Sequence, residues 1–144
     1  MRKILKLLGN NRGEFSAINE PMKLLFFLIT FITFFTFLIQ NNQHENYHAI
    51  LDDMARAYLL KPMEEEGGLT KETLSIFEKE LEKKGIRDKV TLEYATWYPV
   101  DRGEPVEVKI NSFYEIRALA YIGGPILKRP TPVKKIGVSQ QFFR

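Results

Sequence analysis

The sequence contains no cysteine, and this excludes several kinds of chemistry. Disulfide bonds, thiolate metal ligands and cysteine nucleophiles are all ruled out. There is also no glycine-rich phosphate-binding loop, since Gly123-Gly124 is better interpreted as a turn. The net charge of +3 lies at or before Lys23, and the 16 basic and 16 acidic residues that follow balance. A nucleic-acid partner needs a basic face on a folded domain and is not expected.

One uncharged apolar run stands out near the N-terminus. Residues 24–39 read LLFFLITFITFFTFLI and hold six of the eleven phenylalanines. As a helix, the run is about 24 Å long, and the residues at 22 and 23 extend it towards the roughly 30 Å hydrocarbon core of a bilayer. We therefore predict a transmembrane helix over residues 22–40, surrounded by membrane lipid. The alternatives are a buried core helix and a cleaved secretory signal.

The charges around this run predict its orientation. Five basic residues lie before it, and none lies in the ten residues after it. Under the positive-inside rule, residues 1–21 form a cytoplasmic segment and residues 41–144 an extracytoplasmic domain. The protein is therefore expected in the cell membrane as a single-pass protein.

Three threonines interrupt the apolar run at every third residue, at Thr30, Thr33 and Thr36. In a helix, their hydroxyls can bond to backbone carbonyls one turn back. Such small polar residues favour close contact with a neighbouring helix. We expect these three residues to contribute to helix–helix packing.

The junction before the helix carries a leader-like pattern. In Asn11-Arg12-Gly13-Glu14-Phe15-Ser16, a basic stretch of about a dozen residues ends in glycine and a polar-to-apolar segment follows. This resembles the leader of type IV pilin-like proteins, particularly TadE-like pseudopilins and their relatives in Gram-positive conjugative elements. The resemblance implies that a prepilin-type membrane peptidase cuts after Gly13 and leaves Glu14 as the new N-terminus. The alternative is an uncut cytoplasmic cap in which Gly13 forms an ordinary turn.

The resemblance also implies an assembly role for an acidic residue beside the membrane. Cleavage frees an α-amine, and a neighbouring helix must neutralise this charge near the lipid boundary. The position at which the family usually carries an acid is Ile18 here. We assign the role to Glu20, which lies immediately before the apolar run.

The remaining residues predict a small α+β domain. Apolar residues three and four apart favour a helix over about 44–60, which can continue the membrane helix, and a second helix over about 70–84. Thr70 can cap this second helix. Period-two patterns follow, and the first places Val90, Leu92, Tyr94, Thr96 and Tyr98 on one face. Strands are expected at about 89–98, 105–117 and 132–142, with a loop between the last two. The prediction is a three-stranded antiparallel sheet, in which Tyr94, Trp97 and Tyr98 serve strand packing. The alternative for these three residues is an exposed aromatic ladder that binds a partner.

One enzyme-like motif is present, because His44-Glu45-Asn46-Tyr47-His48 fits HExxH. On a helix, these two histidines can bind zinc while the glutamate acts as base, and Asp52 or Glu64–Glu66 offer further ligands. However, the motif lies at the membrane exit, all predicted strands follow it, and His44 and His48 are the only histidines. We predict a polar stem surface, with no metal, cofactor or catalytic activity.

Taken with the resemblance, these features predict a minor pilin-like subunit of a secretion, pilus or conjugation apparatus. Its partners would be other pilin-like subunits or apparatus proteins, and the prepilin-type peptidase if the leader is processed. One alternative is a single-pass accessory membrane protein that never enters a filament. A zinc metallopeptidase is the third interpretation.

Overall fold

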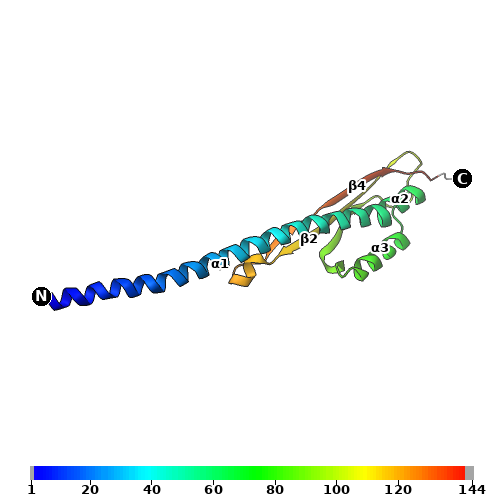
Figure 1. Ribbon diagram of the computed structural model, residues 1–144. Coiled ribbons are helices and arrows are strands. Elements are labelled where there is room, and N and C mark those ends of the chain that lie inside the picture. The colour runs from blue at the N-terminus through cyan, green and yellow to red at the C-terminus, as the bar shows by residue number, and fades with distance from the viewer. Residues whose placement is uncertain (1, 142–144) are drawn as a thin grey trace.

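A computed structural model describes the backbone of residues 2–141 and the side chains of residues 19–141. Its main feature is a continuous helical rod (Figure 1), made of α1 (Arg2–Ala55), the π-helical turn η1 (Arg56–Leu60) and α2 (Lys61–Glu66). A small antiparallel sheet and helix α3 (Lys71–Lys83) pack against the C-terminal part of the rod. The predicted α+β class is confirmed, and the stem helix predicted over 44–60 is continuous with the apolar helix.

The local sequence explains where the rod continues and where it ends. Pro21 lies inside α1 without ending it, and the polar stretch after Ile39 contains no glycine or proline. The rod ends at Gly67, which adopts the left-handed conformation with φ 76°. Gly68 follows with φ 124°, and a Cβ atom there would lie 2.6 Å from the backbone nitrogen of Tyr98. Glycine is therefore required at this close approach between the turn after the rod and the segment after β1.

The sheet is centred on the long strand β2 (Pro105–Ile116). It pairs antiparallel with β1 (Val90–Ala95), with β4 (Val133–Val138) along its first half, and with β3 (Leu127–Pro130) along its last residues. Short 3-10 helices precede β1 (η2, Arg87–Lys89) and separate β2 from β3 (η3, Ala118–Ile122). The sheet thus has four strands instead of the predicted three, because the segment interpreted as a loop contains η3 and β3.

The alternation predicted for the first strand is wrong beyond Leu92. The pairing register with β2 shifts between Leu92 and Tyr94, so the strand contains a bulge. A bulge inserts one residue and reverses which side chains face inward. Consequently Ala95 is buried and the strand ends there. The three aromatic residues expected to pack within the sheet are about half exposed, at 53% for Tyr94, 50% for Trp97 and 49% for Tyr98.

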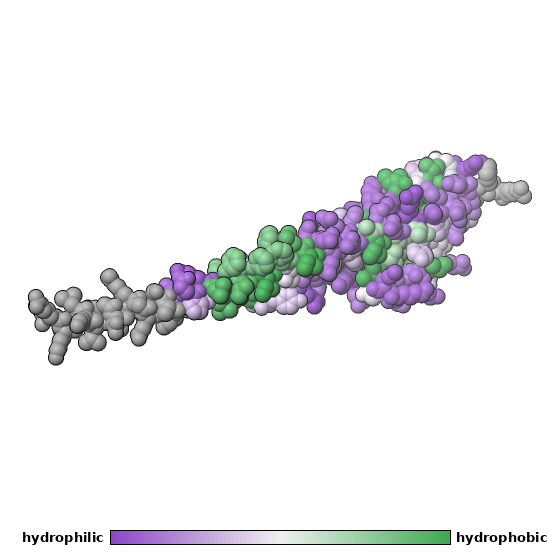
Figure 2. All heavy atoms as spheres, in the orientation of Figure 1, coloured by the Kyte–Doolittle hydropathy of each residue, from purple (hydrophilic) through white to green (hydrophobic). Residues whose placement is uncertain are grey.

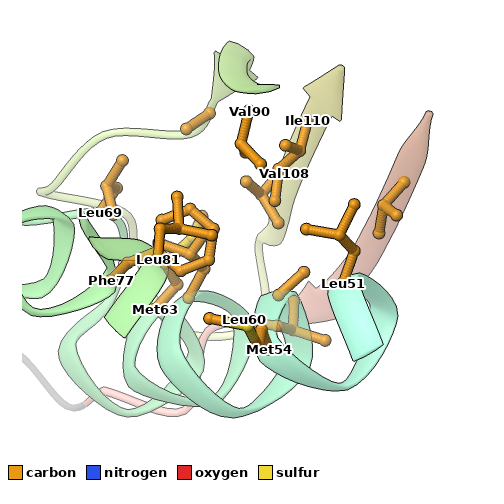
Figure 3. Packing of buried hydrophobic residues seen from close by; sticks show 14 of the residues in the cluster. Leu51, Met54, Leu60, Met63, Leu69, Phe77, Leu81, Val90, Val108 and Ile110 are labelled. Atoms are coloured by element: carbon orange, nitrogen blue, oxygen red, sulfur yellow. The ribbon is translucent and has the colours of Figure 1, made fainter. Parts of the chain in front are cut away.

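The hydrophobic core lies between the rod, α3 and the inner face of the sheet (Figure 3). Thr70 caps α3 by accepting a hydrogen bond from the backbone N–H of Thr73, as its sequence predicts. The rod contributes Leu51, Ala55, Leu59 and Met63, each with no exposed surface. The other fully or nearly buried core residues include Phe77, Leu81, Val90, Val106, Val108, Ile110 and Val133. The core begins at Leu51, so the apolar run of residues 24–39 is not a buried core helix.

Candidate membrane interface and its polar seam

The apolar part of α1 carries the longest run of exposed hydrophobic side chains among the described residues. Figure 2 shows it as a green band between polar, purple regions. From Met22 to Ile39 every large apolar side chain is exposed, and Phe26 reaches 73%. Within the part of the chain that the structure describes, one helix is long and apolar enough to cross a membrane, and this segment is its apolar part. Exposed apolar surface of this size requires a lipid or protein environment.

The three threonines in this segment have unequal surroundings. Thr30 and Thr36 donate to the carbonyls of Phe26 and Ile32, 2.9 and 2.8 Å away, as expected for helical threonines. Thr33 and Thr36 are half-buried, whereas Thr30 is exposed. The covering element is η3 of the same chain, which packs against α1. Helix–helix packing through these threonines stays a prediction, and two of them already have an intramolecular neighbour.

We call residues 118–127, which comprise η3 and the turn leading to the start of β3, the hairpin tip. Ala118 is fully buried, which fixes the base of the tip against α1. Further along, three large side chains are exposed, at 75% for Tyr121, 54% for Ile122 and 48% for Ile126. Beside η3 lies an open groove of about 440 Å³, lined almost entirely by apolar residues of α1 and the tip.

A row of polar contacts, which we call the polar seam, joins α1 to the hairpin just above the tip. The side-chain oxygen of Gln40 accepts hydrogen bonds from the backbone N–H groups of Arg117, at 2.7 Å, and Ala118, at 2.9 Å. It thereby satisfies two donors at the start of η3 that have no partner within that helix. One turn along α1, the Tyr114 hydroxyl donates to Gln43 Oε1 at 3.0 Å.

The seam continues towards the core through His44 and Tyr47. The His44 ring is buried, its Nε2 lies 3.1 Å from Thr131 Oγ1, and its ring contacts that of Tyr114 edge-on. The Tyr47 hydroxyl lies 2.6 Å from Ser112 Oγ. The pKa of His44 is lowered from its ordinary value, first by burial and then by nearby positive charge. This favours the neutral imidazole.

The HExxH residues therefore have different surroundings. The predicted polar stem surface is wrong for His44, which is buried in the seam against Thr131, whereas His48, one turn later, is exposed. Of the further ligands considered, Glu66 accepts hydrogen bonds from Thr70 and Thr73 at the far end of the rod. Among the side chains of residues 19–141, no group of three metal-binding side chains comes together. The buried Nδ1 of His44 has no hydrogen-bond partner there.

The sequence interpretation missed the role of Gln40, Gln43 and Tyr47. The polar run was interpreted only as the exit from lipid. The spacing of residues could have revealed this role. Residues three and four apart follow one another along the helix, at Gln40, His44, Tyr47 and Leu51. They form a single helical stripe that leads from the half-buried threonines into the core.

The residues predicted from the leader lie at the other end of α1. Gly13 and Glu14 fall within the helix, but they are outside the range whose side chains the structure describes. Glu20 is exposed and forms an ion pair with Lys23, with an N–O distance of 3.1 Å. An exposed pair of this kind contributes only about 0–1 kcal/mol, so Glu20 can change partners at little cost.

Comparison with known proteins gives no match to any family model, curated protein or solved structure. The class of protein is therefore defined by the structure itself. It is an α+β protein, and its described residues include one candidate transmembrane helix, which continues into the stem of the folded domain.

Proposed function

We propose that the protein is a minor pilin-like subunit, or pseudopilin, of a secretion, pilus or conjugation apparatus, and that it acts by assembly. The observation that carries this proposal is the continuous rod from Arg2 to Glu66. Its C-terminal part is packed under a small antiparallel sheet, while its apolar part is largely uncovered. This is the outline that the leader resemblance implies, and an apolar helix without a cover is suited to bundling with other helices.

The two sides of the apolar helix are not equivalent in this proposal. On a helix with 100° per residue, Phe31 and Phe35 lie nearly opposite Thr33. Their rings contact each other at 4.4 Å between centroids, and Phe27 extends the row with a 6.0 Å contact to Phe31. Because η3 occupies the threonine side, we assign the phenylalanine side to neighbouring subunits.

The proposed location is the cell membrane, with the N-terminus in the cytoplasm and the sheet outside. The chain has no native cysteine, so a thiol-specific reagent can label this protein only at an introduced cysteine. In Asn42→Cys, the thiol should react with a membrane-impermeant reagent on intact cells. Labelling of Asn42→Cys only after lysis would reverse the orientation.

Leader processing provides the decisive test of the assembly proposal. Mass spectrometry of the native protein should find Glu14 at the N-terminus, and Gly13→Leu should leave a full-length anchored precursor. Because α1 already includes Gly13, cleavage requires the helix to open locally there. A native protein that keeps residues before Gly13 and still functions would favour the accessory-protein alternative.

The assembly role of Glu20 is tested separately. Glu20→Ala should permit cleavage but reduce incorporation into the apparatus, because the freed α-amine loses its counter-charge. Asn19→Ala is the matched control, since Asn19 is also exposed in the preceding position and carries no charge. Cross-linking to other apparatus subunits measures incorporation. Equal incorporation of both variants would contradict the assigned role of Glu20.

A further inference from the structure

The hairpin tip lies at the level of the apolar helix and not above it. It packs against α1, and Ala118, Tyr121 and Ile122 border one groove together with Thr33 and Thr36, which precede Gln40 by seven and four residues. If the bilayer boundary lies at Gln40, these contacts are about 10 and 6 Å below it, at 1.5 Å per residue. If a span of about 20 residues begins at Lys23, the boundary moves to Gln43, and the contacts are deeper by about 4–5 Å. In both cases the tip lies within the depth of the apolar layer.

The composition of the tip suits that depth. Residues 118–127 read ALAYIGGPIL and contain no charged side chain. Tyr121 and Ile122 border the apolar grooves beside α1, and much of the surface of Tyr121, Ile122 and Ile126 remains exposed. An aromatic residue with a polar hydroxyl beside aliphatic residues is typical of segments at the membrane–water interface.

Cationic residues flank the tip on both strands of the hairpin. Arg117 precedes it, and Lys128 and Arg129 follow it. Arg129 donates to Asn41 in the polar seam, and Lys128 Nζ lies 4.8 Å from the centre of the Phe113 ring. These contacts hold positive groups near the level at which α1 leaves the apolar layer, where lipid phosphates lie.

We propose that the hairpin tip is a second membrane-inserted element, which enters the leaflet on the side of the sheet and contacts lipid acyl chains beside α1. Lipid fills the apolar grooves between η3 and α1, and the cations at the base of the tip face the phosphates. This inference rests on the apolar helix spanning a membrane. It does not depend on leader processing or on assembly into an apparatus.

Fluorescence quenching by brominated acyl chains tests the proposal with the full-length protein. The single native tryptophan, Trp97, is removed by Trp97→Phe, and Tyr121→Trp then places a reporter on the tip. Phe31→Trp in the same background is the reference inside the bilayer, and Ile136→Trp on β4 is the reference outside it. All three reporter positions are exposed, at 75%, 48% and 60%, so the replacements leave the core unchanged. Vesicles of phosphatidylcholine and phosphatidylglycerol, with and without brominated chains, supply the comparison.

We expect the Tyr121→Trp reporter to lose fluorescence in brominated vesicles to an extent similar to Phe31→Trp, with a blue-shifted emission. The Ile136→Trp reporter should be unaffected. Quenching of Phe31→Trp alone, with a water-like spectrum for Tyr121→Trp, would overturn the proposal. A blue shift without quenching would also overturn it, because a protein surface such as a second copy would then cover the tip. No quenching at either position would reject both the tip insertion and the transmembrane helix.

Discussion

Replacing Gln40 with alanine should release the hairpin tip from α1. The Gln40 side-chain oxygen is the acceptor for two backbone donors at the start of η3, Arg117 N–H and Ala118 N–H. Truncation removes this acceptor and leaves nothing in its place. Arg117 is exposed and its N–H can bond to water, but Ala118 has no exposed surface. The cost therefore comes mainly from the Ala118 donor.

The free-energy cost of Gln40→Ala comes from leaving one buried hydrogen-bond donor unsatisfied. Such a group costs about 1–3 kcal/mol. A change of this size shifts the equilibrium between docked and undocked tip by roughly 5- to 150-fold. The sheet and core should remain intact, since the first core residue of the rod, Leu51, lies three turns further along α1. The perturbation is local to the tip.

Amide hydrogen exchange of the protein in lipid nanodiscs measures this effect. Residues 118–122 should lose protection in Gln40→Ala, while β1 and the central part of β2 keep theirs. Gln43→Ala is the matched control, because Gln43 accepts a single bond from the Tyr114 hydroxyl, a half-buried group that can rotate towards water. If Gln40→Ala left the protection of residues 118–122 unchanged, or if both variants lost equal protection there, Gln40 would not hold the tip as inferred.

Two further predictions concern the seam and the core. The folded state lowers the pKa of His44, so it binds fewer protons than the unfolded chain, and stability should be complete above about pH 6.5 and decline below it. The melting temperature should fall less between pH 7.5 and pH 5 in His44→Gln than in the native chain, and an equal fall would contradict this. Leu51→Ala should destabilise the fold by about 2–5 kcal/mol, against less than about 0.5 kcal/mol for the exposed neighbour in Ile50→Ala, as measured by denaturant unfolding. Similar losses in the two variants would contradict the placement of the core.

Periodic patterns predicted the main elements, because each follows from a repeated choice of apolar residues. The stem helix, α3 with its Thr70 cap, and the hydrophobic face of β2 all follow from local spacing. β3 was missed because its four residues are all exposed and it pairs only with the end of β2. It carries neither a buried face nor an alternation to detect. The bulge in β1 was missed because it is specified by pairing with β2 and not by the strand's own sequence.

The candidate interface was predicted only in part. A long apolar run identifies a candidate membrane helix from composition alone, and helix length gives the expected depths of Lys23 and Gln40. The tip could not be placed from the sequence, because its position depends on contacts across long chain separations. Gln40 and Ala118 are 78 residues apart, and His44 and Thr131 are 87 apart. Polar pairs of this kind have no signature in either segment by itself.

The π-helical turn at Arg56–Leu60 makes one part of the stem unusually tolerant of a change in length. The fully buried residues Leu51, Ala55, Leu59 and Met63 are each four apart, which would rotate a regular α-helix by about 120° over the series. A π turn accommodates one extra residue and removes most of that drift. Loss of one residue at Arg56–Leu60 would therefore restore ordinary helical winding with the same side facing the sheet. Loss of one residue just before Leu51 would instead turn the stripe that continues into the apolar part of α1 by about 100° relative to the sheet. Natural variation in stem length is thus expected to concentrate at this turn.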